Sequence, residues 1–185
     1  KNRFVYDVGS AGSVSLVFQT IFPVLCFARH EASVELIGGT NVAWSPSADY
    51  IQNVFLPLAE KFGARASFEI TRRGWFPKGG GRLKASVLPV KSLHSADFQQ
   101  KGLLKEVRAS VVSSNLPSSV NVKEESFLKK TLPQNVVVES LDAPADSPGN
   151  CVFVKAVYEN SVAGFSTLGE RGKPSETVVR EAVGA

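Results

Sequence analysis

A ten-residue stretch, residues 72–81, constrains the fold of this chain more than any other segment. It reads RRGWFPKGGG and contains three basic side chains, two aromatic ones and three consecutive glycines. The segments on either side, residues 65–71 and 82–88, alternate apolar and polar side chains, which predicts two β-strands. Consecutive glycines permit a sharp turn and a close approach of the backbone to an anion. The stretch therefore predicts either a glycine-rich hairpin with solvated lysines or a loop that binds phosphates and stacked bases.

The positive charge of the chain is concentrated around this stretch. The whole sequence has a net charge of only +4, with 21 Lys and Arg against 17 Asp and Glu. Residues 61–91 contain eight basic residues and a single acidic one, Glu69, so the rest of the chain is net negative. Clustered positive charge is typical of a surface that binds a polyanion. We therefore expect nucleic acid as a partner, with Arg72, Arg73 and Lys78 as candidate phosphate-binding residues.

Composition and cysteine usage bound the class of protein. A chain of 185 residues that is 43% hydrophobic and 21% charged is typical of a globular protein. Cys26 and Cys151 each lie within an apolar run, which favours buried thiols over a disulfide or a metal site and fits an intracellular setting. The most apolar stretch, residues 14–28, is shorter than the roughly 20 residues that span a bilayer. We therefore expect no membrane association.

Residues 13–28 instead predict a helix that is buried on nearly all sides. Ser13 suits the N-cap position, and Pro23 predicts a kink because its ring removes a backbone donor. Gln19 is the exception in this apolar pattern. A buried amide must be hydrogen-bonded, either to neighbouring backbone or to a ligand at the helix surface.

A strand and a second helix follow this first helix. Residues 33–37 predict a short strand, and residues 46–62 predict a helix after a glycine turn. Pro46 suits the first helical position, and Gly63 suits the position just after the last turn. Pro57 predicts a kink or a local widening within this helix.

Five motifs in the same order resemble the RNA 3′-terminal phosphate cyclase family. They are GSAGS at residues 9–13, GGTN at 38–41, Pro46 with DYI at 49–51, RGWFPKGGG at 73–81, and the pair PGN at 148–150 with LGERG at 168–172. The resemblance covers essentially the whole chain. It implies a ligase-class enzyme that uses ATP and a divalent metal, Mg or Mn, to convert an RNA 3′-phosphate end to a 2′,3′-cyclic phosphate. The family's reaction passes through histidine–AMP and RNA–adenylate intermediates, in the cytoplasm or, in a eukaryote, the nucleus.

The resemblance also implies an α+β fold with α/β-like layers. Repeated units of one sheet and two helices would be interrupted by a smaller α+β insert domain. The sequence pattern agrees, with residues 1–90 as a core unit, 91–168 as the insert domain and 169–185 as the start of the next core segment. Within the later part we expect strands at 103–114, 135–140, 151–158 and 162–168, and helices at 117–131 and 174–183.

By the same resemblance, four residues would contribute to the ATP site. Gln19 matches a position near the nucleotide, and Pro46 matches a proline that packs on the adenine. Tyr50 matches an aromatic position beside the same base, and Asp49 accompanies them. The alternative for Pro46 and Tyr50 is purely structural, as a helix-start proline and a core aromatic residue. Asp49 favours the helix dipole in either case.

The chain has no match to the family's catalytic-histidine motif. Its two histidines, His30 and His94, lie outside that motif, so the sequence assigns no catalytic residue and no metal ligand. The family's N-terminal unit also has no counterpart here. We therefore expect a partial, inactive piece of a cyclase. Two other functions stay open: a cyclase-like ribosome-assembly factor that does not cyclise RNA, and an unrelated α/β binding domain. The sequence does not indicate an oligomeric state.

Overall fold

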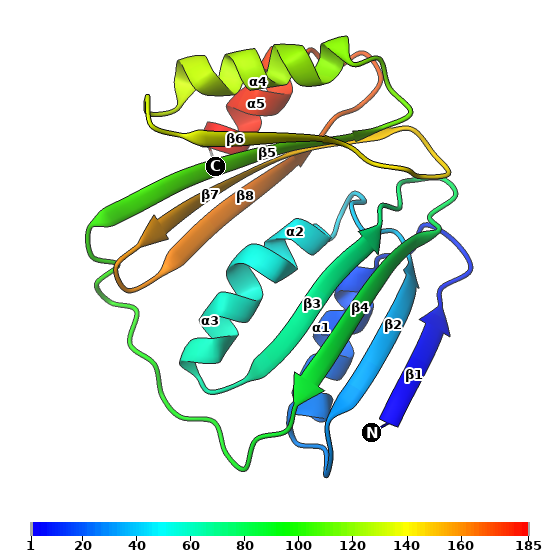
Figure 1. Ribbon diagram of the computed structural model, residues 1–185, viewed down its shortest axis with the longest axis vertical. Coiled ribbons are helices and arrows are strands. Elements are labelled where there is room, and N and C mark those ends of the chain that lie inside the picture. Colours follow the sequence, from blue (N-terminus) through cyan, green and yellow to red (C-terminus); the bar gives the residue numbers. More distant parts are fainter. Residues whose placement is uncertain (1, 185) are drawn as a thin grey trace. The chain divides into compact units, whose positions relative to one another are not determined.

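The computed structural model describes residues 2–184 and shows an α+β fold (Figure 1). Its contacts divide the chain into two compact units. The first unit extends to Asp97 and includes Ala145–Ser147, and the second contains Phe98–Pro144 and the residues from Pro148 onward. Each unit has a four-stranded mixed sheet with its own hydrophobic core. In the described part of the chain, no helix is long and apolar enough to cross a membrane.

The sheet of the first unit has the strand order β1-β2-β4-β3. β1 (Asn2–Asp7) runs parallel to β2 (Ala32–Gly38). β4 (Gly81–Leu88) lies antiparallel between β2 and β3 (Arg65–Arg72). The sequence pattern predicted β2, β3 and β4 but not β1, because its consecutive apolar residues show no alternation.

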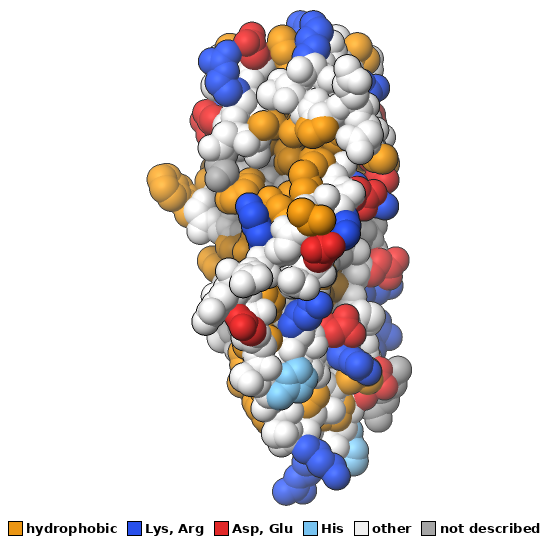
Figure 2. All heavy atoms as spheres, turned by 90° about the vertical axis from the view of Figure 1, so that its left-hand side faces the viewer, with side chains coloured by type: hydrophobic (Ala, Val, Ile, Leu, Met, Phe, Trp, Pro, Cys, Tyr) orange, Lys and Arg blue, Asp and Glu red, His pale blue; other side chains and the backbone are white. Residues whose placement is uncertain are grey.

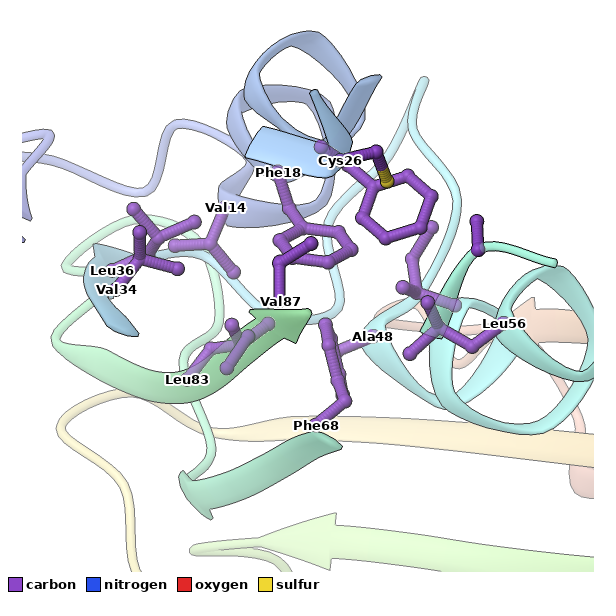
Figure 3. Packing of buried hydrophobic residues seen from close by; sticks show 14 residues of the cluster. Val14, Phe18, Cys26, Val34, Leu36, Ala48, Leu56, Phe68, Leu83 and Val87 are labelled. Carbon is purple, nitrogen blue, oxygen red and sulfur yellow. The ribbon is translucent and has the colours of Figure 1, made fainter. Parts of the chain in front are cut away.

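α1 (Val14–Cys26) connects the two parallel strands. It begins as predicted, with the Ser13 hydroxyl accepting a hydrogen bond from the Leu16 backbone nitrogen at 3.2 Å. Phe18 points from α1 into the core above the sheet (Figure 3), and its ring meets that of Phe68 edge to face.

The prediction that α1 is buried on nearly all sides is wrong. Gln19 is exposed, and the side chain of Val24 is 72% exposed. In the described unit the helix packs one face on one sheet, so its other face is left open. Gln19 therefore does not need the internal partner that a buried amide would require.

The second helical region of this unit is continuous but changes its winding. It consists of α2 (Ala48–Tyr50), a π-helical segment (Ile51–Phe55) and α3 (Leu56–Lys61). The helix does not begin at Pro46, because the Ser47 hydroxyl accepts a hydrogen bond from the Tyr50 nitrogen and so makes Ser47 the N-cap. The wider π turn ends at Phe55, two residues before Pro57, which confirms the predicted local widening. Gly63 follows the last turn with φ of +93°, as expected.

The sheet of the second unit has the strand order β6-β5-β7-β8. Its elements are β5 (Leu104–Ser114), α4 (Ser119–Thr131), β6 (Val137–Asp142), β7 (Gly149–Tyr158), β8 (Val162–Leu168) and α5 (Ser175–Gly184). Figure 1 shows α4 and α5 on one face of this sheet.

The last helix, α5, lies in the second unit, whereas the expected domain boundaries placed it outside the insert domain. Residues 169–185 were expected to begin a further core segment. Instead, Val178, Val179 and Ala182 of α5 are fully buried in the core of the second unit, together with Leu128 of α4. The apolar face of α5 thus forms part of the core of the second unit.

One acidic side chain is buried in the second unit. Glu124 of α4 is only 1% exposed and accepts a hydrogen bond from the Asn150 amide nitrogen at 2.8 Å. Burial raises the pKa of Glu124, and the hydrogen bond from Asn150 offsets only part of this effect. The folded chain therefore binds a proton at Glu124 more tightly than the unfolded chain does. Stability from this group is full below its unfolded pKa and falls as pH rises through the higher folded pKa.

Replacing Glu124 with glutamine should remove this fall, because the amide oxygen still accepts from Asn150 but carries no charge to desolvate. We expect the urea midpoint of Glu124→Gln to decline less than that of the wild type between about pH 4 and pH 8. Glu125→Gln, at the partly exposed neighbouring position, is the matched control and should leave the wild-type decline in place. Identical pH profiles for Glu124→Gln and the wild type would contradict the prediction.

Candidate functional site

Four segments of the first unit meet at one end of its sheet. They are the β1–α1 loop (residues 8–13), the β2–α2 loop (39–47), the β3–β4 loop (73–80) and Ala145–Ser147. The Gly39 nitrogen donates to the Gly12 carbonyl at 2.8 Å, and the Thr40 nitrogen donates to the Gly74 carbonyl at 2.9 Å. Because β1 and β2 are parallel, this end carries their carboxyl termini, where open α/β sheets bind ligands. We therefore take these loops as the candidate site.

The glycines of these loops serve the contacts between them. A Cβ at Gly74 would collide with the Gly38 carbonyl oxygen, and one at Gly79 would collide with the Ser10 carbonyl oxygen. Gly79 and Gly80 also adopt φ near +70°, a conformation that residues with side chains rarely adopt. Gly74 thus lets the β3–β4 loop pack against the backbone at the end of β2, and Gly79 lets it pack against the backbone of the β1–α1 loop.

A buried ion pair joins the β3–β4 loop to the start of α2. The Arg73 guanidinium donates to both oxygens of the Asp49 carboxylate, at 2.6 and 2.8 Å. Asn41 completes the cluster, since its amide nitrogen donates to Asp49 at 2.8 Å and its amide oxygen accepts from Arg73 at 3.1 Å. Burial alone would raise the pKa of Asp49, but the charge of Arg73 and these hydrogen bonds outweigh it and lower that pKa.

The three candidate phosphate-binding residues lie in different environments. Arg73 is committed to Asp49 and buried. Arg72 forms a half-exposed ion pair with Asp146 at 2.6 Å. The Lys78 side chain is exposed and forms no ion pair within the described residues, while its backbone nitrogen is anchored by the Ser147 hydroxyl at 3.2 Å.

Half of the basic side chains in residues 61–91 are paired with acids from elsewhere in the chain. Four of the eight basic residues form ion pairs: Arg65 with Glu60, Arg72 with Asp146, Arg73 with Asp49 and Arg82 with Glu35. Figure 2 shows Lys and Arg side chains interspersed with Asp and Glu, with no continuous basic area on the face drawn. The electrostatic field of the segment is therefore weaker than its residue count predicts.

The four residues expected at an ATP site are only partly brought together. Pro46 and Tyr50 flank the helix N-cap and are half-buried, and the Tyr50 ring packs against the core of the first unit. The Asp49 carboxylate is occupied by Arg73 and Asn41. Gln19 lies exposed on α1 and forms no hydrogen bond with the other three in the described structure.

Sequence reasoning missed two residues of this site. Asn41 bridges the buried ion pair, and Trp44, in the same loop, is 100% exposed with φ of +62°. The signal available in the sequence was their position: Asn41 ends the GGTN motif, and Trp44 lies between that motif and Pro46. In the β3–β4 loop, Phe76 is 77% exposed, whereas the adjacent Trp75 is buried at 3% exposure.

Among residues 2–184, no group of three or more His, Cys, Asp or Glu side chains is arranged to hold a metal ion. Cys26 and Cys151 are both buried.

Both histidines lie at the end of the first unit away from the loops. His30 follows the end of α1, and the His94 nitrogen donates to the Phe62 carbonyl at the end of the second helical region. Each helical region spans 13 or 14 residues, so each histidine lies about 20 Å from the loops at the helix start.

Comparison with known proteins gives one consistent result. A family model described as "RNA 3′-terminal phosphate cyclase" matches residues 1–181. A protein of that name from Gloeothece citriformis is 39% identical, over 98% of this chain and 54% of its own length. One from Pyrobaculum aerophilum is 38% identical, over 97% of this chain and 53% of its own length. The chain thus spans about half the length of the curated relatives it matches.

Removing one partner of the buried ion pair should destabilise the first unit strongly. Asp49→Asn leaves the Arg73 charge buried without its counter-ion, which costs about 3–5 kcal/mol of unfolding free energy. Arg72→Gln, which breaks only the exposed pair with Asp146, is the control and should cost at most about 1 kcal/mol.

The destabilisation should also depend on pH. Because the folded pKa of Asp49 is lowered, its contribution is complete above its unfolded pKa of about 3.9 and disappears as pH falls through the folded value. Denaturant titrations should therefore show a constant gap between wild type and Asp49→Asn from about pH 5 to pH 8, and a narrowing gap in acid. A gap no larger than that of Arg72→Gln at pH 7 would contradict the structural role.

Proposed function

The chain belongs to the RNA 3′-terminal phosphate cyclase family, and on that premise we propose that it forms part of an ATP-dependent enzyme. The reaction would convert an RNA 3′-phosphate end to a 2′,3′-cyclic phosphate through histidine–AMP and RNA–adenylate intermediates. The observation that carries this proposal is the family match over residues 1–181. The convergence of the glycine motifs at one end of the sheet supports it, because this is where such sheets bind ligands.

Within this function we divide the candidate residues between ATP, RNA and support. Pro46 and Tyr50, half-buried beside the helix N-cap, are the proposed contacts of the adenine, with Gln19 offering an exposed amide. Arg72 and Lys78 are the proposed contacts of RNA phosphates. Asp49 and Arg73 hold one another, so their proposed role is to fix the loops rather than to contact either substrate directly.

The position of the two histidines leads to a direct test of the chain by itself. Adenylation needs an imidazole nitrogen held in line with the α-phosphate. Because His30 and His94 lie about 20 Å from the loops, neither can attack a nucleotide bound there. The 185-residue chain, incubated with α-labelled ATP and Mg²⁺ or Mn²⁺, should therefore gain no acid-labile label.

Two further measurements complete this test. Equilibrium dialysis with ATP measures whether the chain binds the nucleotide. If Pro46 and the Tyr50 ring contact the adenine, Pro46→Ala and Tyr50→Ala should weaken this binding, whereas Tyr50→Phe, which keeps the ring, should leave it nearly unchanged. Label on His30 or His94 would place the catalytic centre elsewhere and overturn the proposal. RNA binding without any ATP binding would favour the non-catalytic, cyclase-like function instead.

The proposed phosphate contact of Lys78 predicts how RNA affinity responds to salt. Each single-strand phosphate that a protein neutralises contributes about −0.7 to the slope of log affinity against log salt concentration. Lys78→Gln should therefore make this slope shallower by about 0.7, measured by fluorescence anisotropy of a labelled oligoribonucleotide in increasing KCl. Lys123→Gln, at an exposed position on α4, is the matched control. Equal slopes for Lys78→Gln and Lys123→Gln would move the RNA contact away from this loop.

A further inference from the structure

The loop between β2 and α2 presents its largest side chain entirely to solvent. Trp44 is 100% exposed, so nothing in the described structure covers the indole. Its backbone has φ of +62°, the left-handed conformation that a bulky side chain disfavours. Strained backbone of this kind persists where the surroundings impose it, and it is concentrated at ligand sites. Folding alone therefore gives no reason for a tryptophan here, since glycine would fit this backbone better.

A second exposed aromatic residue lies in the β3–β4 loop, which is hydrogen-bonded to the β2–α2 loop. Phe76 is 77% exposed and follows Gly74 by two residues. The Gly74 carbonyl accepts hydrogen bonds from the backbone nitrogens of Thr40 and Asn41, at 2.9 and 3.3 Å. Trp44 follows Asn41 by three residues. Even with both segments fully extended, the two aromatic Cα atoms lie within about 25 Å of each other, so one short single strand can reach both.

Buried polar contacts hold the two loops that carry these aromatic residues. The buried Asp49–Arg73 pair and Asn41 hold the two loops together, and Trp75, next to Phe76, is buried. Both rings therefore follow backbone that these contacts hold in place within two or three residues, and such restraint lowers the entropy that a ligand must remove on binding.

The chemistry of Trp44, Phe76 and the nearby Lys78 suits unpaired bases. Base stacking on aromatic side chains is tolerant of sequence, and it is usually combined with cations that contact the backbone. Lys78, two residues beyond Phe76, supplies an exposed ammonium group without an ion-pair partner in the described residues. A mononucleotide site, in contrast, is concave and covers most of its ligand, whereas both rings here face solvent.

We infer that Trp44 and Phe76 form a stacking surface for unpaired bases of single-stranded RNA, beside a phosphate contact at Lys78. The inference rests on the proposed function for the choice of RNA, but it requires neither ATP binding nor catalysis. It also predicts selectivity, because the bases of a duplex are already stacked on each other and cannot lie on the two rings.

The test measures binding of a ten-nucleotide single-stranded oligoribonucleotide with a 3′-phosphate by fluorescence anisotropy at low salt. Stacking on an aromatic ring contributes about 1–3 kcal/mol per base. Trp44→Ala and Phe76→Ala should therefore each weaken binding by about 5- to 140-fold. Trp44→Tyr, which keeps a ring, should lose much less. The salt slope should stay unchanged in Trp44→Ala, because no phosphate contact is removed.

Two controls separate stacking from damage to the fold. Trp44→Gly suits the backbone conformation and removes a side chain without contacts, so its melting temperature should equal or exceed that of the wild type while RNA binding falls. Phe27→Ala removes an aromatic ring that is 56% exposed beyond the far end of α1 and should bind RNA like the wild type.

Tryptophan fluorescence gives an independent readout. The chain has two tryptophans, and only Trp44 is exposed. RNA should quench the Trp44 emission, and Trp44→Phe should remove most of the quenching while the buried Trp75 stays unaffected. Duplex RNA of the same sequence should bind more weakly and be insensitive to Trp44→Ala.

Each contrary outcome has a distinct meaning. No RNA binding by the chain at low salt, or RNA binding that is equal in wild type, Trp44→Ala and Phe76→Ala, would overturn the stacking surface and leave the proposed enzyme function standing. Loss of ATP binding in Trp44→Ala with RNA binding intact would assign the indole to the nucleotide and overturn the inference as well. Failure of ATP binding in the wild-type chain, with RNA binding sensitive to Trp44, would instead challenge the proposed function alone.

Discussion

The bidentate contact between Asp49 and Arg73 is the constraint on which the loop end of the first unit depends. It connects the first turn of α2 to the β3–β4 loop, and Asn41 ties in the loop after β2. Burying two charges is costly, so such a pair adds little stability compared with well-packed apolar residues. Its advantage here is geometric. A guanidinium that meets a carboxylate through two parallel hydrogen bonds fixes both distance and orientation, and this sets the register of one loop against the other.

The glycines follow from this constraint. Once Arg73 is fixed, Gly74 must pass directly beside Gly38 and Gly81, where no Cβ fits. The triplet was ambiguous in the sequence because a phosphate-binding loop and a backbone-packing loop require the same residue type. The two kinds of loop differ in what lies against the glycines. In this structure, backbone atoms of the chain itself lie against Gly74 and Gly79. Ligand contacts of these loops then fall to the side chains that project from them.

Much of the fold could be predicted because its elements have clear local signals. Alternating side chains predicted β3 and β4, Ser13 predicted the start of α1, and Pro57 predicted the widened turn. The errors occurred where tertiary contacts decide. The exposure of Gln19 depends on how many surfaces cover α1, and the placement of α5 depends on which core accepts its apolar face.

The candidate site was harder to predict for the same reason. The count of charges along residues 61–91 could not show that Arg72 meets an acid 74 positions later, or that Arg82 meets one 47 positions earlier. The assignment of Arg72, Arg73 and Lys78 to phosphates came from that count. It stays a prediction for Arg72 and Lys78, whereas the proposed role of Arg73 is to hold Asp49. Trp44 carried no periodic signal, because its exposure follows from the conformation of a loop.

Neutralised charge and exposed rings together bear on what kind of nucleic acid this surface suits. A surface that binds duplexes without regard to sequence depends on many unpaired cations, because phosphate contacts supply most of the affinity. Here half of the basic residues in residues 61–91 form ion pairs with acids, and Lys78 is the cation of the β3–β4 loop that has no such partner among residues 2–184. On the proposed function, part of the affinity for RNA would then come from contacts that do not weaken with salt. The base stacking proposed for Trp44 and Phe76 would be such a contact, and it is open only to a strand whose bases are unpaired, which is the state of a single-stranded RNA end.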